Sequence, residues 1–252
     1  MKKKKTKRIV IVSILVVLLA AGGIALYTYA PILAMKPAPT GKVDDTGITA
    51  IKNASNAVFF IDTDEGGILI DAGSDRDGLI KSIGELAIAP DAVKHIFLTH
   101  TDYDHVAALD HFPNANIYIG ENEKLLLDGT AKRNATGGNA LPADVDINGL
   151  LLVKDGQSLQ IGDHSISCIA APGHTPGSTL YLLDGSYLFT GDAFGVSGGE
   201  IAVHPFTMDA ETAKATIRSL TPVLQKSKLV LTSHYGCFRP EELKLETDIT
   251  AP

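Results

Sequence analysis

The segment His100 to His105 (His-Thr-Asp-Tyr-Asp-His) places four side chains that can bind a metal within six residues. It follows directly on the end of His95 to Thr99, a largely apolar stretch that is typical of a short strand. Loops at strand ends carry much protein chemistry, and imidazole and carboxylate groups are common zinc ligands. The alternative is a polar turn in which Asp104 caps a helix over 106–112. A metal bound here would need further ligands from distant parts of the chain, so this segment constrains the fold.

Three later segments have the same form, an apolar strand that leads into one His or Asp. His174 lies in the turn 172–177 (Pro-Gly-His-Thr-Pro-Gly), whose glycines and prolines suit the rigid placement that a metal ligand needs. Asp192 follows a strand and a glycine, which allows close approach of the backbone. His234 follows another strand. One such residue is more often a cap or a surface residue, but four such segments in one chain favour a shared metal site.

Together these segments, from about Thr46 to Gly236, resemble the metallo-β-lactamase superfamily. That family has a His-x-His-x-Asp-His run, then a single His, an Asp and a final His. The strand that ends at Asp71-Ala72-Gly73 is similar to the family's early Asp-x-Gly turn, which supports the metals from beneath. The resemblance implies an α/β (α+β) domain, folded as an αββα sandwich, with metal-dependent hydrolase activity. The metal ligands that it implies are His100, Asp102, Asp104, His105, His174, Asp192 and His234.

Asp102 stands where the commonest form of the run has His. A carboxylate can still bind zinc, but it adds a negative charge and shifts the preference toward iron or manganese. By the resemblance, one metal is held by His100, Asp102 and His174, the second by Asp104, His105 and His234, and Asp192 bridges them. The predicted cofactors are therefore two divalent ions, with zinc favoured over iron or manganese.

The resemblance implies that the two metals share a water and lower its pKa until hydroxide is available near neutral pH. This hydroxide would attack a small ester, thioester, lactone or phosphodiester, with Asp104 as the catalytic residue that orients it and relays a proton. An iron-dependent oxidoreductase is the first alternative, although no flavin-binding or rubredoxin-like segment is visible. Hydrolysis of β-lactams is a minor alternative, because β-lactamases of this family have Cys or Ser where Asp192 stands. A non-catalytic binding domain is least expected, because the ligand set is intact.

Hydrophobic patterns predict strands and helices interleaved along the chain, which is typical of a layered α/β or α+β domain. Helices are expected over 79–87, 121–127 and 210–220. Strands are expected at 48–51, 56–62, 67–71, 96–99, 117–119, 150–154, 158–161, 165–170, 179–183, 187–190 and 229–232. The remaining histidines, His95, His111, His164 and His204, are interpreted as structural or surface residues, although His204 lies on a loop that could face the site.

The chain begins with six basic residues among its first eight, followed by Ile9 to Leu26, which carries no charge. This stretch is about long enough to span a bilayer as a helix, and its basic flank predicts a cytoplasmic N-terminus with the rest of the chain outside. We therefore predict a single-pass membrane anchor in residues 1–30, with a cleaved signal peptide and secretion as the alternative. Residues 31–45 are a predicted linker, 46–240 the catalytic domain and 241–252 a tail.

Apart from the six N-terminal cations, the chain has 16 basic and 29 acidic residues. Because affinity for nucleic acid depends on Lys and Arg, the expected partner is a small molecule and not a nucleic acid. The loop 124–147, where selectivity would lie, offers only Lys124, Lys132 and Arg133 as cations. Two cysteines far apart, Cys168 and Cys237, favour buried thiols over a disulfide. The sequence does not indicate an oligomeric state.

Overall fold

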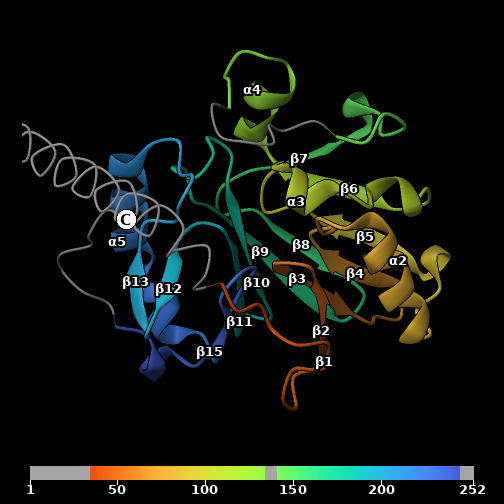
Figure 1. Ribbon diagram of the computed structural model, residues 1–252, viewed down its shortest axis with the longest axis horizontal. Coiled ribbons are helices and arrows are strands. Elements are labelled where there is room, and N and C mark those ends of the chain that lie inside the picture. Colours follow the sequence, from red (N-terminus) through yellow and green to blue (C-terminus); the bar gives the residue numbers. More distant parts are fainter. Residues whose placement is uncertain (1–34, 134–140, 245–252) are drawn as a thin grey trace, which may run out of the picture. The chain divides into compact units, whose positions relative to one another are not determined.

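Two β-sheets pack against each other in residues 35–133 and 141–244, which the computed structural model describes (Figure 1). The first sheet has seven strands in the order β1 (Gly41–Lys42), β2 (Ile48–Asn53), β3 (Asn56–Ile61), β4 (Gly67–Ile70), β5 (Val93–Phe97), β6 (Asn116–Gly120) and β7 (Leu151–Val153). The second has six, in the order β15 (Gly236–Phe238), β14 (Leu229–Thr232), β11 (Tyr187–Gly191), β10 (Thr179–Leu183), β9 (His164–Ala170) and β8 (Ser158–Ile161). Strands β12 (Gly195–Ser197) and β13 (Glu200–Ala202) form a separate hairpin.

Helices connect these strands. The α-helices are α2 (Arg76–Glu85), α3 (Tyr103–Val106), α4 (Lys124–Leu127) and α5 (Ala210–Lys226). Short 3-10 helices are η1 (Pro90–Ala92), η2 (Leu109–His111), η3 (Glu121–Glu123), η4 (Ile147–Gly149) and η5 (Pro240–Glu242). Figure 1 shows α2 and α5 on opposite sides of the paired sheets. The mixed α/β architecture predicted from the sequence is confirmed in the described residues.

Strand β3 shows why the first sheet lies between two cores. Successive side chains of a strand point to opposite faces of the sheet. Phe59 and Ile61 join a core between the two sheets, which also contains Phe189 from β11. Val58 and Phe60 join a second core, to which α2 contributes buried side chains. Because β3 is covered on both faces, its sequence is apolar without alternation.

Helix α5 continues beyond its predicted end at Leu220 to Lys226. Pro222 lies inside the helix, where it removes one backbone hydrogen-bond donor. The apolar side of the helix nevertheless continues to Leu224, which is buried. Burial of that side chain offsets part of the cost of the missing hydrogen bond.

The segment after β5 does not form the polar turn, capped by Asp104, that was the alternative to a metal site. The helix α3 begins at Tyr103, so Asp104 lies inside it and does not cap a helix over 106–112. Asp102 occupies the N-cap position, but its side chain accepts no capping hydrogen bond. The carboxylates of this segment are therefore free to take part in other contacts.

Two sequence predictions concern the ends of the chain. The predicted membrane span, Ile9 to Leu26, and most of the predicted tail lie outside the described residues. Within residues 35–133 and 141–244, no helix combines the length and the apolar character that crossing a bilayer requires.

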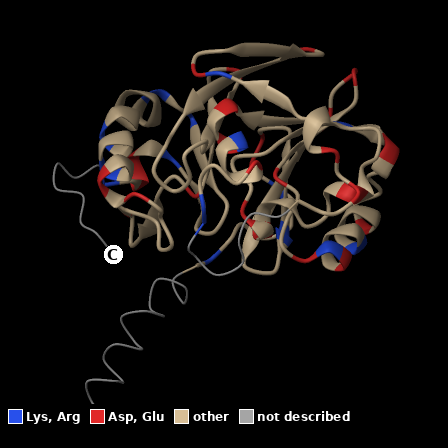
Figure 2. Ribbon diagram, turned by 90° about the horizontal axis from the view of Figure 1, so that it is seen from above, with Lys and Arg blue, Asp and Glu red and all other residues tan. Residues whose placement is uncertain are grey.

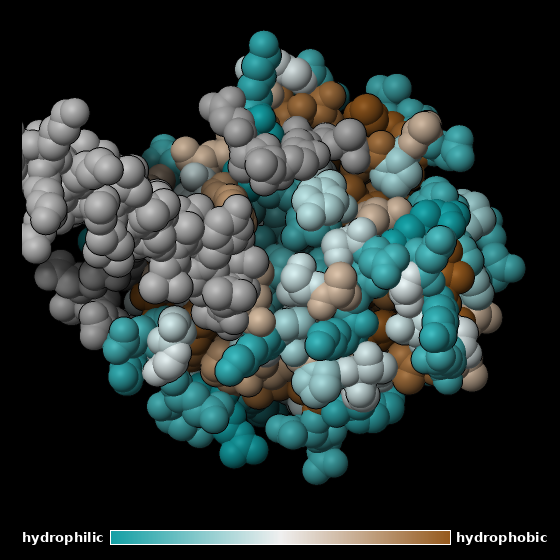
Figure 3. All heavy atoms as spheres, in the orientation of Figure 1, coloured by the Kyte–Doolittle hydropathy of each residue, from teal (hydrophilic) through white to brown (hydrophobic). Residues whose placement is uncertain are grey.

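The surface of the described part carries both signs of charge. Figure 2 shows Lys and Arg next to Asp and Glu on the helices, and α5 contains the exposed pair Lys214–Glu211, with Nζ and Oε1 2.7 Å apart. Such exposed pairs contribute little stability. On the face shown in Figure 3, hydrophilic side chains surround smaller hydrophobic patches.

Candidate metal centre

The topology brings together strand ends that carry predicted ligands. Strands β11 and β14 are parallel neighbours, so Asp192 and His234 follow adjacent strand ends. Strand β5 ends in the other sheet, just before His100. The two sheets are connected at this point, because the backbone N–H of Thr179 donates to the carbonyl oxygen of Thr99 at 2.9 Å.

The buried carboxylate of Asp192 is the centre of a histidine cluster. Its Oδ2 atom lies 3.3 to 3.9 Å from the Nε2 atoms of five imidazoles. These belong to His234 (3.3 Å), His105, His174 and His204 (3.6 Å each) and His100 (3.9 Å). Its other oxygen, Oδ1, has no hydrogen-bond partner.

Four sets of three side chains each bring their potential ligand atoms within 4.8 Å of one another. The sets are His100, Asp102 and His174; Asp104, His105 and His234; His100, His105 and Asp192; and His174, Asp192 and His204. The structure thus brings all seven predicted ligands together, and it adds His204.

Two of the imidazoles make a further contact through Nδ1, which orients their Nε2 atoms toward Asp192. His105 Nδ1 lies 2.8 Å from Asp71 Oδ2, and His234 Nδ1 donates to the carbonyl oxygen of Ser55 at 2.7 Å. Asp71 is buried and also accepts a hydrogen bond from the backbone N–H of Thr99 (2.8 Å). Hydrogen bonds behind ligating histidines fix the ring orientation and the tautomer in metal sites.

Several buried ring nitrogens of the cluster are suited to binding divalent cations. Buried polar groups normally have hydrogen-bond partners. Within residues 35–133 and 141–244, no such partner exists for His100 Nε2, His105 Nε2, His174 Nδ1 or either ring nitrogen of His204. Imidazole nitrogen and carboxylate oxygen form the donor set that zinc uses, and iron and manganese also accept it.

Charges within the cluster oppose the effect of burial on the pKa values of its side chains. Burial opposes ionisation of Asp104, but the charge of His105 and the contact with His234 lower its pKa to about 2. Burial also disfavours a charged His234, yet the charge of Asp192 raises its pKa to about 10. Near neutral pH the metal-free protein therefore holds ionised carboxylates and a protonated His234, and a metal would displace that proton.

Arg133 contacts Asp102 through two of its three guanidinium nitrogens. Arg133 Nε lies 2.9 Å from Asp102 Oδ1, and Nη2 lies 2.5 Å from Oδ2. The Arg133 side chain is only 2% exposed. Sequence analysis treated Arg133 as one of three loop cations, because its partner lies 31 residues away and no local pattern connects them.

Glu123 connects the two ligand-bearing loops that hold His100 and His174. It is fully buried and accepts hydrogen bonds from Thr101 N (2.7 Å), Thr101 Oγ1 (2.8 Å), Thr175 Oγ1 (2.7 Å) and Gly177 N (3.1 Å). Sequence analysis missed this residue, because a glutamate in a short helix normally indicates an exposed side chain.

Among the other histidines, His95 and His164 lie outside the cluster. His95 Nδ1 is 3.1 Å from the hydroxyl of Tyr118, and His164 Nδ1 is 2.7 Å from Asp184 Oδ2. His204 is not a surface residue, since it is buried and its Nε2 lies 3.6 Å from Asp192 Oδ2. Its position on a loop after that aspartate was the only available signal.

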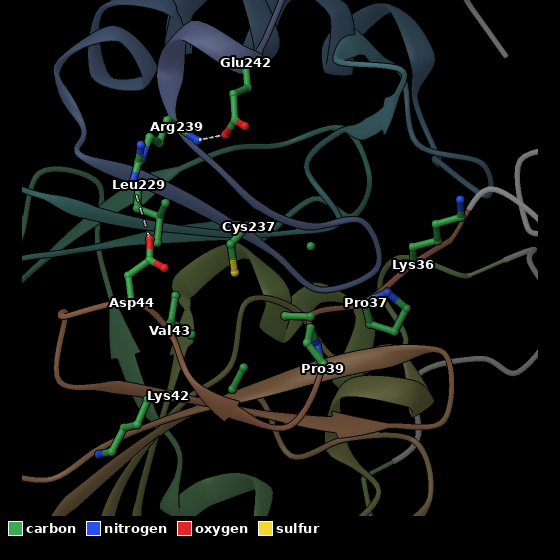
Figure 4. A pocket seen from close by; sticks show the side chains of 13 residues that line it. Lys36, Pro37, Pro39, Lys42, Val43, Asp44, Leu229, Cys237, Arg239 and Glu242 are labelled. Carbon is green, nitrogen blue, oxygen red and sulfur yellow. Dashed lines mark hydrogen bonds and ion pairs between the residues drawn. The ribbon is translucent and has the colours of Figure 1, made fainter.

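A separate pocket of about 430 Å³ contains none of the cluster residues. Figure 4 shows the sulfur of Cys237 in this pocket, among side chains of the 36–44 segment and of Arg239. Burial and the nearby charge of Asp44 raise the pKa of Cys237 to about 12. Both cysteines are free, and Cys168 is buried. These thiols are protonated near neutral pH and therefore poor nucleophiles.

Known proteins are similar to this chain. The family model described as the metallo-β-lactamase superfamily matches residues 52–234. YqgX of Bacillus subtilis (strain 168), a probable metallo-hydrolase, is 30% identical over 189 residues, which cover 71% of this chain and 84% of that protein. The hydroxyacylglutathione hydrolase of Citrobacter koseri is 32% identical over 149 residues, which cover 57% of this chain and 49% of that protein.

A solved structure has a similar fold. The crystal structure of BJP-1, a subclass B3 metallo-β-lactamase of Bradyrhizobium japonicum, matches with a TM-score of 0.62 and 24% identity. The match covers 79% of each chain. At this level of identity the similarity shows the fold alone.

Proposed function

The chain belongs to the metallo-β-lactamase superfamily and is a hydrolase of that fold, and from this premise we propose that it uses two divalent metal ions to cleave a small ester, thioester or lactone. The observation that carries this proposal is the group of five imidazole nitrogens around Asp192 Oδ2, all within 3.9 Å. Bound zinc ions would supply a hydroxide nucleophile near neutral pH and stabilise the developing oxyanion.

The ligand groups support a division of the residues between two ions. We assign Asp104, His105 and His234 to one ion, and His100 and His174 to the other. Asp192 lies between the two groups and is assigned to both. The predicted ligand Asp102 lies within reach of the second group, as part of the set with His100 and His174.

Asp104 is proposed as the catalytic residue. Its Oδ2 lies 3.4 Å from His234 Nε2, and its side chain is 18% exposed, which makes it more accessible than Asp192. Its low pKa keeps it ionised at neutral pH, so that it can orient a nucleophile and accept a proton for transfer to the leaving group.

Exposed apolar side chains near the ligands favour a substrate with an apolar acyl group. Tyr103 (50% exposed) lies between two residues of the ligand run. Phe206 (46%) and Met208 (36%) follow His204, and the backbone N–H of Met208 donates to the carbonyl oxygen of His174. The similarity to a hydroxyacylglutathione hydrolase, whose name specifies a thioester, supports thioesters within this class.

The test is a metal and substrate screen of the full-length chain purified in detergent. We expect bound divalent metal, with turnover on acyl thioesters or lactones that a chelator abolishes and zinc restores. Phosphodiesters and β-lactams are included as comparison substrates. Stoichiometric iron with an optical band and no hydrolysis would instead support the oxidoreductase alternative.

Replacing Asp104 by asparagine is expected to lower kcat by about 100- to 10,000-fold, the usual contribution of a positioned acid–base group. Asp110→Asn is the matched control, because this carboxylate lies close in sequence but pairs with Arg76 at 2.8 Å. Metal content is measured for both variants. Full turnover by Asp104→Asn would remove the assigned role.

We also propose that the N-terminal segment anchors the protein in the membrane, with the catalytic domain outside the cytoplasm. The support is the uncharged stretch Ile9 to Leu26 and its basic flank. Protease added to intact spheroplasts is expected to digest the catalytic domain. Protection of the domain until the membrane is permeabilised would contradict this topology.

A further inference from the structure

We propose that His204, rather than Asp102, provides the third imidazole or carboxylate ligand of the ion assigned to His100 and His174. This inference rests on the proposed function, because it concerns the same metal centre. Three observations carry it: the unpaired state of His204, the engagement of Asp102 by Arg133, and the contact of Arg133 with the turn that carries His204.

His204 is buried, and neither of its ring nitrogens has a hydrogen-bond partner among the residues that the structure describes. Its Nε2 lies 3.6 Å from Asp192 Oδ2, and its ring centroid lies 4.9 Å from that of His174. These three residues bring their ligand atoms within 4.8 Å of one another. A buried imidazole with two unpaired nitrogens is costly unless another group satisfies it, and a metal ion does so.

The backbone holds His204 in place. Its carbonyl oxygen accepts hydrogen bonds from the N–H of Thr207 at 3.2 Å and from Thr207 Oγ1 at 2.7 Å. The turn follows directly on the hairpin β12–β13, and the Tyr235 ring packs edge-on against the imidazole, with centroids 5.8 Å apart. A side chain fixed in this way is suited to metal binding.

Asp102 already has a buried ionic partner, and its Oδ2 also lies 3.2 Å from His174 Nε2. Both carboxylate oxygens contact Arg133, in the two-point geometry that makes such pairs strong. Both side chains are largely buried, at 2% exposed for Arg133 and 12% for Asp102. A metal on Asp102 would compete with the buried guanidinium for this carboxylate, and weakening the charge partner of a buried cation is unfavourable.

Arg133 contacts both Asp102 and the turn that carries His204. Its Nη1 donates to the carbonyl oxygen of Phe206 at 2.7 Å and to that of His174 at 3.2 Å. The same side chain therefore retains Asp102 and holds the turn that carries His204. Three imidazoles with a shared carboxylate also form a softer donor set than two imidazoles with two carboxylates, which favours zinc over manganese.

The test compares metal binding by the full-length protein with that of three variants, His204→Ala, Asp102→Asn and His111→Ala. Zinc and Co²⁺ are titrated into metal-free protein, and bound metal is counted by mass spectrometry. We expect two ions in the wild type and in the His111→Ala control. In Asp102→Asn we expect a smaller loss of affinity than in His204→Ala, because the amide oxygen still accepts a hydrogen bond from Arg133. In His204→Ala, we expect the affinity for the second ion to fall at least about 10-fold, with a changed Co²⁺ absorption spectrum. Two tightly bound ions in His204→Ala, with one lost in Asp102→Asn, would overturn the inference.

A measurement on the wild-type protein tests the inference independently of whether the variants fold. In wild-type protein labelled with [¹⁵N]histidine, zinc is expected to shift the ring nitrogen resonance of His204. An unchanged His204 resonance at zinc saturation would overturn the inference while leaving the hydrolase proposal intact. A wild-type protein that binds no divalent metal would overturn both.

Discussion

Replacement of Asp192 by asparagine is expected to weaken binding of both metal ions by at least about 100-fold and to abolish metal-dependent turnover. Even residues that only orient metal ligands contribute about 10- to 100-fold to affinity, and the Nε2 atoms of five imidazoles lie within 3.9 Å of Asp192 Oδ2. The amide keeps the shape of the side chain but removes the charge. Calorimetric zinc titration measures the loss.

The same variant is expected to change the metal-free protein. The charge of Asp192 raises the pKa of His234 to about 10 against the effect of burial, so this pKa should fall in Asp192→Asn. Because the pKa of folded His234 is raised, its contribution to stability is present below the unfolded pKa of about 6.5 and is lost as the pH rises toward 10. Urea unfolding of chelator-treated protein at pH 7 and pH 9.5 should therefore show a smaller pH dependence in the variant.

Asp163→Asn is the control for both measurements, since its side chain is 76% exposed and pairs only with His164. It is expected to bind zinc like the wild type. Equal zinc affinity in Asp192→Asn and in this control would show that the cluster is not a metal centre.

Replacement of Glu123 by alanine is expected to lower the free energy of unfolding by about 4 kcal/mol or more, because each unpaired buried donor costs about 1 to 3 kcal/mol. The change leaves two backbone N–H groups and two hydroxyls, of Thr101, Thr175 and Gly177, without their acceptor. These groups belong to the loops that hold His100 and His174, so zinc affinity should fall as well.

The matched control is Glu121→Ala, which changes an exposed glutamate in the same short helix η3. Urea unfolding of both variants, with and without zinc, separates loss of the fold from loss of the metal. A Glu123→Ala protein as stable as the control would show that the four hydrogen bonds contribute no net stability.

Most of the strands and helices could be predicted from local sequence patterns. Strands such as β3 and β10 were visible because each is a short apolar run bounded by turn residues. The hairpin β12–β13 was missed, although Gly198 and Gly199, both with positive φ, are the turn residues that such hairpins require. Its strands have three residues each, too few to give a clear period.

The sequence also determined which residues gather at the centre, because each predicted ligand stands at the end of a strand and the family's topology brings those ends together. Only the tertiary structure decided how the polar groups pair. Arg133 reaches Asp102 across 31 residues, and Glu123 reaches Thr175 across 52. Periodicity and turn chemistry are local, whereas such pairs depend on which loops converge. For the same reason, the sequence could identify Asp102 as unusual, but only the fold placed Arg133 beside it and His204 beside Asp192.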